Sequence, residues 1–238
     1  MPARRMSTER LHLTLMLILT FSTGVVDAVG YLGLDRVFTG NMTGNVVLLG
    51  MAVAGGDDLP VLRPALALLF FMVGAALAGR ALRKAPSGWS SATSCTFAAV
   101  AVGAAGLAVL LALVDVTADE VLGSVVTSGL ALIMGIQAGT AKRLAIAEVT
   151  TVVVTSTITG LASDSRLAGG KGKHWVRRAL AILLIGLGAV AGAFALLVDL
   201  WVGVALSAVL SAVVAGAGHL RHRQDRHEQR RKEPALAS

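Results

Sequence analysis

A polar, glycine-rich stretch, Thr39–Asn45, lies between two apolar runs of this 238-residue chain. It reads Thr-Gly-Asn-Met-Thr-Gly-Asn, and Asp27 precedes it inside the first apolar run. In hydrocarbon, unpaired polar groups and backbone amides are costly, so such a stretch at membrane depth indicates a lined cavity or a solute pathway. Two interpretations of Asp27 stay open. It is either a functional carboxylate within a membrane span or an interfacial residue bonded to a neighbouring Ser or Thr.

A second unusual segment, Glu148–Ser163, is rich in β-branched residues. Such residues favour extended backbone, so the segment could enter the protein extended. The alternative is an ordinary helix whose Thr hydroxyls bond back to its own carbonyls. Together the two segments, Asp27 and the corresponding Gln137 give a candidate solute or proton pathway. Its residues are Asp27, Thr39, Asn41, Thr43, Asn45, Gln137, Thr151, Thr155 and Thr159.

The composition indicates a membrane protein, because 55% of the residues are hydrophobic and 15% are charged. Apolar runs of about 20 residues match a hydrocarbon core of about 30 Å, and they do not alternate as barrel strands do. The single cysteine excludes an internal disulfide. The sequence therefore predicts an all-α, polytopic membrane protein. The predicted spans are Leu11–Leu34, Leu62–Ala81, Ser94–Val114, Leu122–Ala141, Ala179–Val198 and Trp201–Gly218.

The placement of charges decides how the two short segments, Val37–Ala54 and Glu148–Ser163, run. If both crossed the membrane, the basic loops Arg80–Lys84 and Lys142–Arg143 would face outside, against the positive-inside bias. If both dip in and return, those loops share one side with the termini. We therefore predict six spanning helices plus two short re-entrant or broken segments, in the inner membrane, with cytoplasmic termini. The +7 net charge lies mostly in loops and tail, so no nucleic-acid partner is expected.

Three crossings in each half would give the halves opposite orientations, which makes an inverted repeat. Val26-Asp27-Ala28 parallels Ile136-Gln137-Ala138, and the Thr-x-x-x-Thr-Gly pattern that ends at Gly44 returns at Gly160. Four glycines predicted to pack helices also correspond: Gly74, Gly79, Gly188 and Gly192. The predicted organisation is a cytoplasmic N-terminus (1–10), a first membrane half (11–118), a second half (119–220) and a basic cytoplasmic tail (221–238).

Two groups of motifs resemble those of the YoaK-like family of uncharacterised bacterial membrane proteins. The first combines Val26-Asp27-Ala28-x-x-Tyr31-Leu32 with Met42-Thr43-Gly44-Asn45. The second combines Met134-Gly135-Ile136-Gln137 with Thr157-x-Thr159-Gly160-Leu161-x-x-Asp164. Ala138 departs from the family pattern, which often has Asn after the Gln. The resemblance implies a helical inner-membrane protein with no established substrate or reaction.

The sequence leaves three classes of function open. The favoured one is a small-solute channel or secondary transporter with a polar mid-membrane site, and the alternative is a non-transporting membrane scaffold, assembly or stress-related module. An enzyme fits least, because the catalytic motifs of metalloproteases and serine hydrolases are absent from the sequence. We expect no catalytic residue, metal or cofactor.

The partners expected are the lipid bilayer and a small polar or ionic solute, and a homo-oligomer stays open. One conflict concerns the charge of the solute. The positive N-terminal end of a helix after Asn45 would favour an anion or a neutral solute, whereas Asp27 would oppose an anion.

Overall fold

The structure, a computed structural model, describes residues 7–56, 59–116, 119–144, 154–172 and 174–232. Within these ranges the chain forms eight α-helices and a short 3-10 helix, with no strand. In chain order they are α1 (Thr8–Gly33), α2 (Met42–Val53), α3 (Leu62–Ala81), α4 (Ser91–Leu113), α5 (Glu120–Leu144), α6 (Val154–Ser163), η1 (Arg166–Ala168), α7 (Trp175–Ala195) and α8 (Leu200–Lys232).

Six helices, α1, α3, α4, α5, α7 and α8, are long and apolar enough to cross a membrane. Each has at least 20 residues, and at 1.5 Å per residue this matches a hydrocarbon core of about 30 Å. The 12 residues of α2 and the 10 residues of α6 cover only about 18 and 15 Å. The prediction of an all-α, polytopic membrane protein with six spanning helices and two short segments is confirmed.

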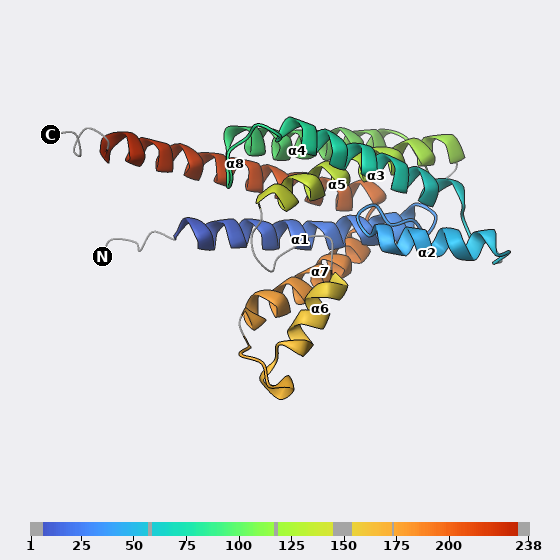
Figure 1. Cartoon of the computed structure of the whole chain (residues 1–238). Helices are drawn as coiled ribbons and strands as arrows, with labels where there is room; N and C mark the ends of the chain where they lie inside the picture. The colour runs from blue at the N-terminus through green and yellow to red at the C-terminus, as the bar shows by residue number, and fades with distance from the viewer. Residues whose placement is uncertain (1–6, 57–58, 117–118, 145–153, 173, 233–238) are drawn as a thin grey trace.

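Helices α1 and α5 form the centre of the bundle. In each of them 61% of the apolar span is buried, against 22% in α3 and in α7. Helix α7 packs on α1, α3 packs on α5, and α4 pairs with α8 (Figure 1). The outer faces of α3 and α7 carry exposed apolar side chains such as Leu69, Leu183 and Leu187, which suit contact with lipid.

Glycines allow the central helices to approach their partners closely. A Cβ added to Gly24 of α1 would overlap the backbone of Ile185, and one added to Gly188 of α7 would overlap that of Phe21. The α3–α5 crossing is built alike, because Gly74 meets the backbone of Leu132, and Gly135 that of Phe71. Small residues at such crossings let helix backbones pack without side chains between them.

Three of the four glycines predicted to pack helices lie at these crossings: Gly74, Gly188 and Gly192, which faces Val25 and Ala28 of α1. Gly79 differs from them. No described atom lies within 4 Å of the position that its Cβ would take. In the part of the chain that the structure describes, Gly79 therefore makes no close helix contact, because it lies on the outward face of α3.

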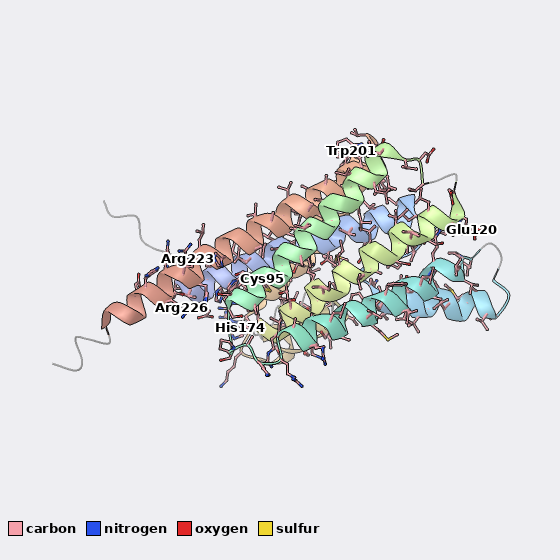
Figure 2. All side chains as sticks on the ribbon, turned by 90° about the horizontal axis from the view of Figure 1, so that it is seen from above. Cys95, Glu120, His174, Trp201, Arg223 and Arg226 are labelled. Atoms are coloured by element: carbon pink, nitrogen blue, oxygen red, sulfur yellow. The ribbon has the colours of Figure 1, made fainter. Side chains whose placement is uncertain are left out.

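Charged residues gather at the two ends of the bundle. Figure 2 shows His174, Arg223 and Arg226 at one end, and Glu120 and Trp201 at the other. We call the first the basic end and the second the acidic end. At the basic end, Arg177 of α7 pairs with Glu9 of α1 at 2.8 Å. The same end contains the start of α1 and the C-terminal part of α8, as the charge distribution predicts.

The segment that contains α2 enters and leaves at the acidic end. Helix α1 ends there, with Gly33 against Leu200 of α8. The chain then turns back beside α1 as far as Asn41, and α2 returns along the bundle (Figure 1). Helix α3 begins at the acidic end again, with Arg63 beside Gly123 of α5. The first short segment is therefore a re-entrant loop and half-helix.

Helix α6 approaches from the opposite end. Helix α5 ends at the basic end, where Leu144 joins a core cluster with Leu15 and Trp89. Helix α6 finishes beside the start of α7, where Arg178 donates to the carbonyl oxygen of Gly160 and to Asp164. Of the second segment, 148–153 lies outside the described residues. From Val154 to Ser163 the helical alternative holds and the extended one does not.

Candidate functional site

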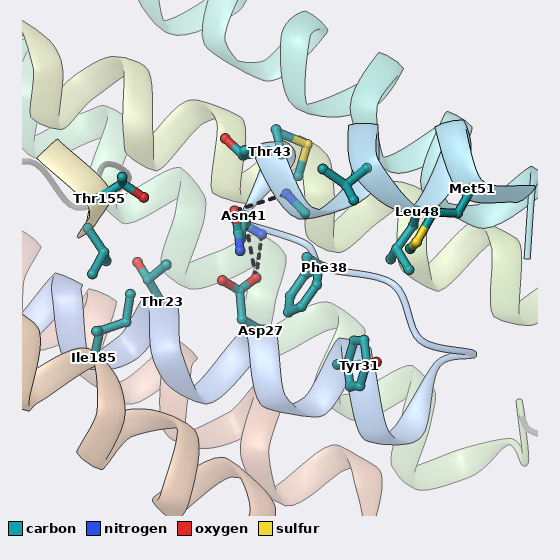
Figure 3. Close-up of a pocket in the computed structure, with 15 residues that line it drawn as sticks. Thr23, Asp27, Tyr31, Phe38, Asn41, Thr43, Leu48, Met51, Thr155 and Ile185 are labelled. Carbon is teal, nitrogen blue, oxygen red and sulfur yellow. Dashed lines mark hydrogen bonds between the residues drawn. The ribbon is translucent and has the colours of Figure 1, made fainter. Parts of the chain in front are cut away.

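Asp27 anchors the loop that turns back into the protein before α2. Only 9% of this residue is exposed, although it lies two turns from the end of α1. Its Oδ1 atom accepts backbone N–H bonds from Thr39 (3.1 Å), Gly40 (2.7 Å) and Asn41 (3.3 Å) (Figure 3). The sequence left open whether this carboxylate is functional or is bonded to a neighbouring Ser or Thr. Its partners are backbone amides of the loop, one of them that of Thr39.

Asn45 holds the other side of the same loop. Its amide nitrogen donates to the carbonyl oxygen of Phe38 at 2.6 Å, and its Oδ1 accepts from the N–H of Phe38 at 2.9 Å. The side chain is fully buried. Its amide oxygen bonds to the peptide group before Phe38, and its amide nitrogen bonds to the peptide group after Phe38. Asn45 therefore satisfies backbone groups that hydrocarbon would leave unpaired.

Asn41 begins α2 as its N-cap. Its Oδ1 accepts from the N–H of Gly44 at 3.2 Å, which satisfies a free amide of the first turn. The helix thus begins at Met42, so the sequence expectation of a helix after Asn45 placed its start too late. The N-terminal end of α2 points at the carboxylate of Asp27, which already accepts the amide of Asn41.

A cavity of about 720 Å³ opens between these elements. Residues of α1, of the loop, of α2, of the start of α6 and of α7 line it (Figure 3). Its polar members come from three helices and the loop: Thr23, Asp27, Tyr31, Asn41, Thr43 and Thr155. Both short segments therefore line one cavity, which lies beside the C-terminal half of α1.

The formal charge on the described lining of the cavity is negative. Among the described residues that line it, Asp27 is the single carboxylate, and none is Lys, Arg or His. The carboxylate occupies the N-terminal end of α2, where the helix dipole and loop amides stabilise negative charge. The positive end of the helix is thereby used by the protein itself. The cavity therefore presents the carboxylate, and not a free helix end.

Gln137 joins the site from α5 through Thr23. Its amide nitrogen donates to the hydroxyl of Thr23 at 3.2 Å, and that hydroxyl donates to the carbonyl of Leu19 at 2.9 Å. The Oε1 of Gln137 and the hydroxyl of the fully buried Thr39 find no partner among the described residues. Unsatisfied buried polar atoms are rare in native proteins, and both of these adjoin the Asp27 cavity.

The predicted pathway residues thus separate into three groups. Asp27, Asn41, Thr43 and Thr155 line the cavity. Thr39, Asn45 and Gln137 lie buried behind its wall. Thr159 lies outside the cavity on an exposed face of α6, where its hydroxyl donates to the carbonyl of Thr155 at 2.9 Å. Thr151 lies outside the described residues.

The sequence prediction missed Thr23, Tyr31 and Phe38, which also line the cavity. Thr23 and Tyr31 lie four residues before and after Asp27, so helical spacing puts all three on one face of α1. That signal was present in the sequence. Phe38 stacks on Tyr31 with ring centroids 4.9 Å apart, and nothing in the sequence pattern indicates this contact.

Comparison with known proteins shows which family the chain is similar to, and that family has no known function. The model of a protein family of unknown function, DUF1275, matches residues 15–217. The chain is 37% identical over 190 residues to the UPF0700 transmembrane protein YoaK of Bacillus subtilis (strain 168), covering 76% of this chain and 83% of that protein. No solved structure matches the chain. The description of YoaK as a transmembrane protein agrees with the membrane architecture.

Proposed function

We propose that this chain, which belongs to the DUF1275 family of proteins of unknown function, is a secondary transporter for a small solute. One observation carries the proposal: the cavity at Asp27 is lined by both short segments, which enter from opposite ends of the bundle. Broken helices that meet at mid-membrane are how many secondary transporters build their substrate sites.

The helix packing supports an inverted repeat, which would let the two halves rock about such a site. Exchanging α1 with α5 and α3 with α7 exchanges the two glycine crossings described above. Gly24 against Ile185 then corresponds to Gly135 against Phe71, with one constant shift of numbering along each helix. In this register Gly135 is the equivalent of Gly24. The register differs by one residue from the alignment of Val26-Asp27-Ala28 with Ile136-Gln137-Ala138 that the sequence suggested. Asp27 then corresponds to Ala138, so the carboxylate belongs to one half only.

The proposed orientation places the basic end in the cytoplasm of a bacterial inner membrane. Arg177, Arg221 and Arg223 lie at this end together with both described termini, whereas Asp115 and Asp199 line a pocket at the acidic end. Cytoplasmic segments of inner-membrane proteins carry the excess of Lys and Arg. In this orientation the loop before α2 enters from outside and α6 enters from the cytoplasm.

Asp27 is the proposed proton site of the transporter. It is the single carboxylate among the described residues that line the cavity; Tyr31 is the other titratable group there, and α5, α6 and α7 contribute no charged residue to it. A proton taken up at Asp27 would neutralise the cavity, and its release would restore the negative charge. Such a change in charge is how an intramembrane carboxylate couples proton movement to transport.

The test uses proteoliposomes that contain a pH-sensitive dye and receive one external solute at a time: glycine, glycerol, tetramethylammonium or phosphate. We expect one solute to drive a proton flux in the wild-type protein. Asp27→Asn should keep the loop bonds and lose the pH dependence of transport. Glu120→Gln, an exposed carboxylate at the acidic end, is the matched control and should behave as the wild type. An Asp27→Asn protein with unchanged pH dependence would eliminate this role.

A non-transporting membrane module is the second candidate, favoured by the structural use of Asn41 and Asn45. Both side-chain amides bond to backbone groups, as residues that only hold the fold together would do. If the protein is only a scaffold, no solute in the panel moves in the wild type. Alanine at either asparagine then lowers thermal stability and changes no flux.

A further inference from the structure

Asp27 gives the cavity a negative charge, and no Lys, Arg or His stands among the described residues that line it. Oδ1 of Asp27 accepts three N–H bonds, which favour the ionised carboxylate. In Figure 3 the second oxygen points away from the loop amides, toward the side where Thr23 and Thr155 lie. A buried charge is stabilised when an opposite charge pairs with it. The free side of the carboxylate therefore favours a cationic ligand.

The cavity is poorly suited to a metal ion. At about 720 Å³ it has the size of a site for a small organic molecule. Hard cations require six or more oxygen ligands, whereas the hydroxyl of Thr23 and the amide oxygen of Asn41 are already bonded within the protein. No group of three His, Cys, Asp or Glu side chains that could hold a metal occurs among the described residues.

Aromatic and apolar side chains form the rest of the wall. Tyr31 and Phe38 stack beside Asp27, with an angle of 26° between their rings, and Met51 lies near them along α2. Aromatic faces attract organic cations through the ring quadrupole, and thioethers adapt to apolar groups of varied shape. A polar head at the carboxylate would thus have an apolar surface next to it.

A second pocket, of about 400 Å³, continues from the same place between α1 and α7. It shares Asp27, Tyr31, Phe38 and Ile185 with the cavity, and its other lining residues are apolar or glycine, such as Leu32 and Gly186. This pocket offers room for an alkyl chain attached to a charged head held at Asp27.

We infer that the Asp27 cavity binds a small organic ammonium ion. The charged nitrogen pairs with the free oxygen of Asp27, in the cavity that Thr43 and Thr155 also line, and the alkyl part lies against Tyr31 and Phe38. This inference rests on the proposed function for its site and names the substrate class, and its test separates the two.

The experiment measures ligand binding to the full-length protein in lipid nanodiscs by calorimetry at neutral pH. The probes each have four carbon atoms and differ in charge: n-butylammonium, n-butanol and butyrate. We expect saturable binding of n-butylammonium alone. Asp27→Asn should weaken it at least tenfold, and Tyr31→Leu should weaken it about threefold or more through loss of the ring face. Glu120→Gln should leave it unchanged.

Tyr31→Leu keeps the test decisive if Asp27→Asn fails to fold, because the Tyr31 side chain lies on a partly exposed face and makes no hydrogen bond among those described. Its backbone carbonyl accepts from the N–H of Arg36 in the loop, and leucine keeps that bond. Equal binding of butanol, tighter binding of butyrate, or wild-type affinity in the Tyr31→Leu protein would overturn the inference. Ammonium binding without any solute flux would refute the transporter and keep the site. Flux of glycine, glycerol or phosphate without ammonium binding would do the reverse.

Discussion

At the level of single residues, the re-entrant loop depends on side chains that replace missing backbone partners. Asn45 pairs with the N–H and the carbonyl of Phe38, and Asp27 accepts three further amides. An irregular loop at membrane depth survives only where protein satisfies its peptide groups. These two side chains therefore make the loop possible, and the cavity depends on the loop.

Asn45→Ala should destabilise the protein, because it leaves the N–H and carbonyl of Phe38 unpaired in a buried place. Each unsatisfied buried group costs about 1–3 kcal/mol. The measurement is thermal unfolding in detergent, followed by size-exclusion chromatography after heating. Asn41→Ser is the control, since serine also caps a helix, adds no charge beside Asp27 and should retain the wild-type transition. A wild-type transition in the Asn45→Ala protein would show that the Phe38 pairing contributes nothing.

The residue types in the sequence predicted which residues of the candidate site lie close together better than they predicted the bonds that each side chain makes. Asp27 and the Thr39–Asn45 stretch were predicted to belong together, and they do. The amide of Asn45 was assigned to the pathway, although it is turned to backbone. Composition cannot distinguish these uses, because an amide that binds a solute and one that binds a peptide have the same chemistry and the same place in the chain.

At the level of elements, hydropathy predicted the six spans closely because lipid forces each long apolar run to be a helix. The start of α2 was predicted less well, since the cap at Asn41 extends the helix back through Met42 and Thr43 into the polar stretch. Helix α6 resisted prediction for a different reason. Its β-branched residues favour extended backbone, whereas in the protein they form a helix in which the hydroxyl of Thr159 bonds to the carbonyl of Thr155.

Two glycines on α3 provide a matched test of the helix crossings. Gly74→Ala should destabilise the protein by about 1–3 kcal/mol, because its Cβ would overlap the backbone of Leu132 and overpack the α3–α5 contact. Gly79→Ala has open space in the described structure and should be neutral or slightly stabilising, since alanine is the better helix former. Thermal unfolding of the two variants, measured side by side, tests whether only Gly74 lies at a close helix crossing. Equal losses of stability would contradict the close crossing at Gly74.

At the scale of the whole molecule, the two ends of the bundle can be assigned to sides of the membrane by cysteine labelling. In a Cys95→Ser background, a cysteine at position 115 should react with an impermeant maleimide on intact cells. Cysteines at positions 83 and 171 should react only after permeabilisation. The reason is the excess of Lys and Arg at the basic end. Labelling of position 83 or 171 on intact cells would reverse the proposed orientation.

Helix α8 has 33 residues and continues without a break past Gly218, which packs against the ring of Trp89. Tryptophan prefers the headgroup region, and the 14 helical residues that follow Gly218, as far as Lys232, rise about 21 Å. Electrostatic attraction to lipid headgroups fades within about 8 Å at physiological ionic strength. The outer part of this helix is thus a stiff spacer, and a fluorophore attached near its end would sense the aqueous phase and soluble proteins before it sensed the bilayer surface.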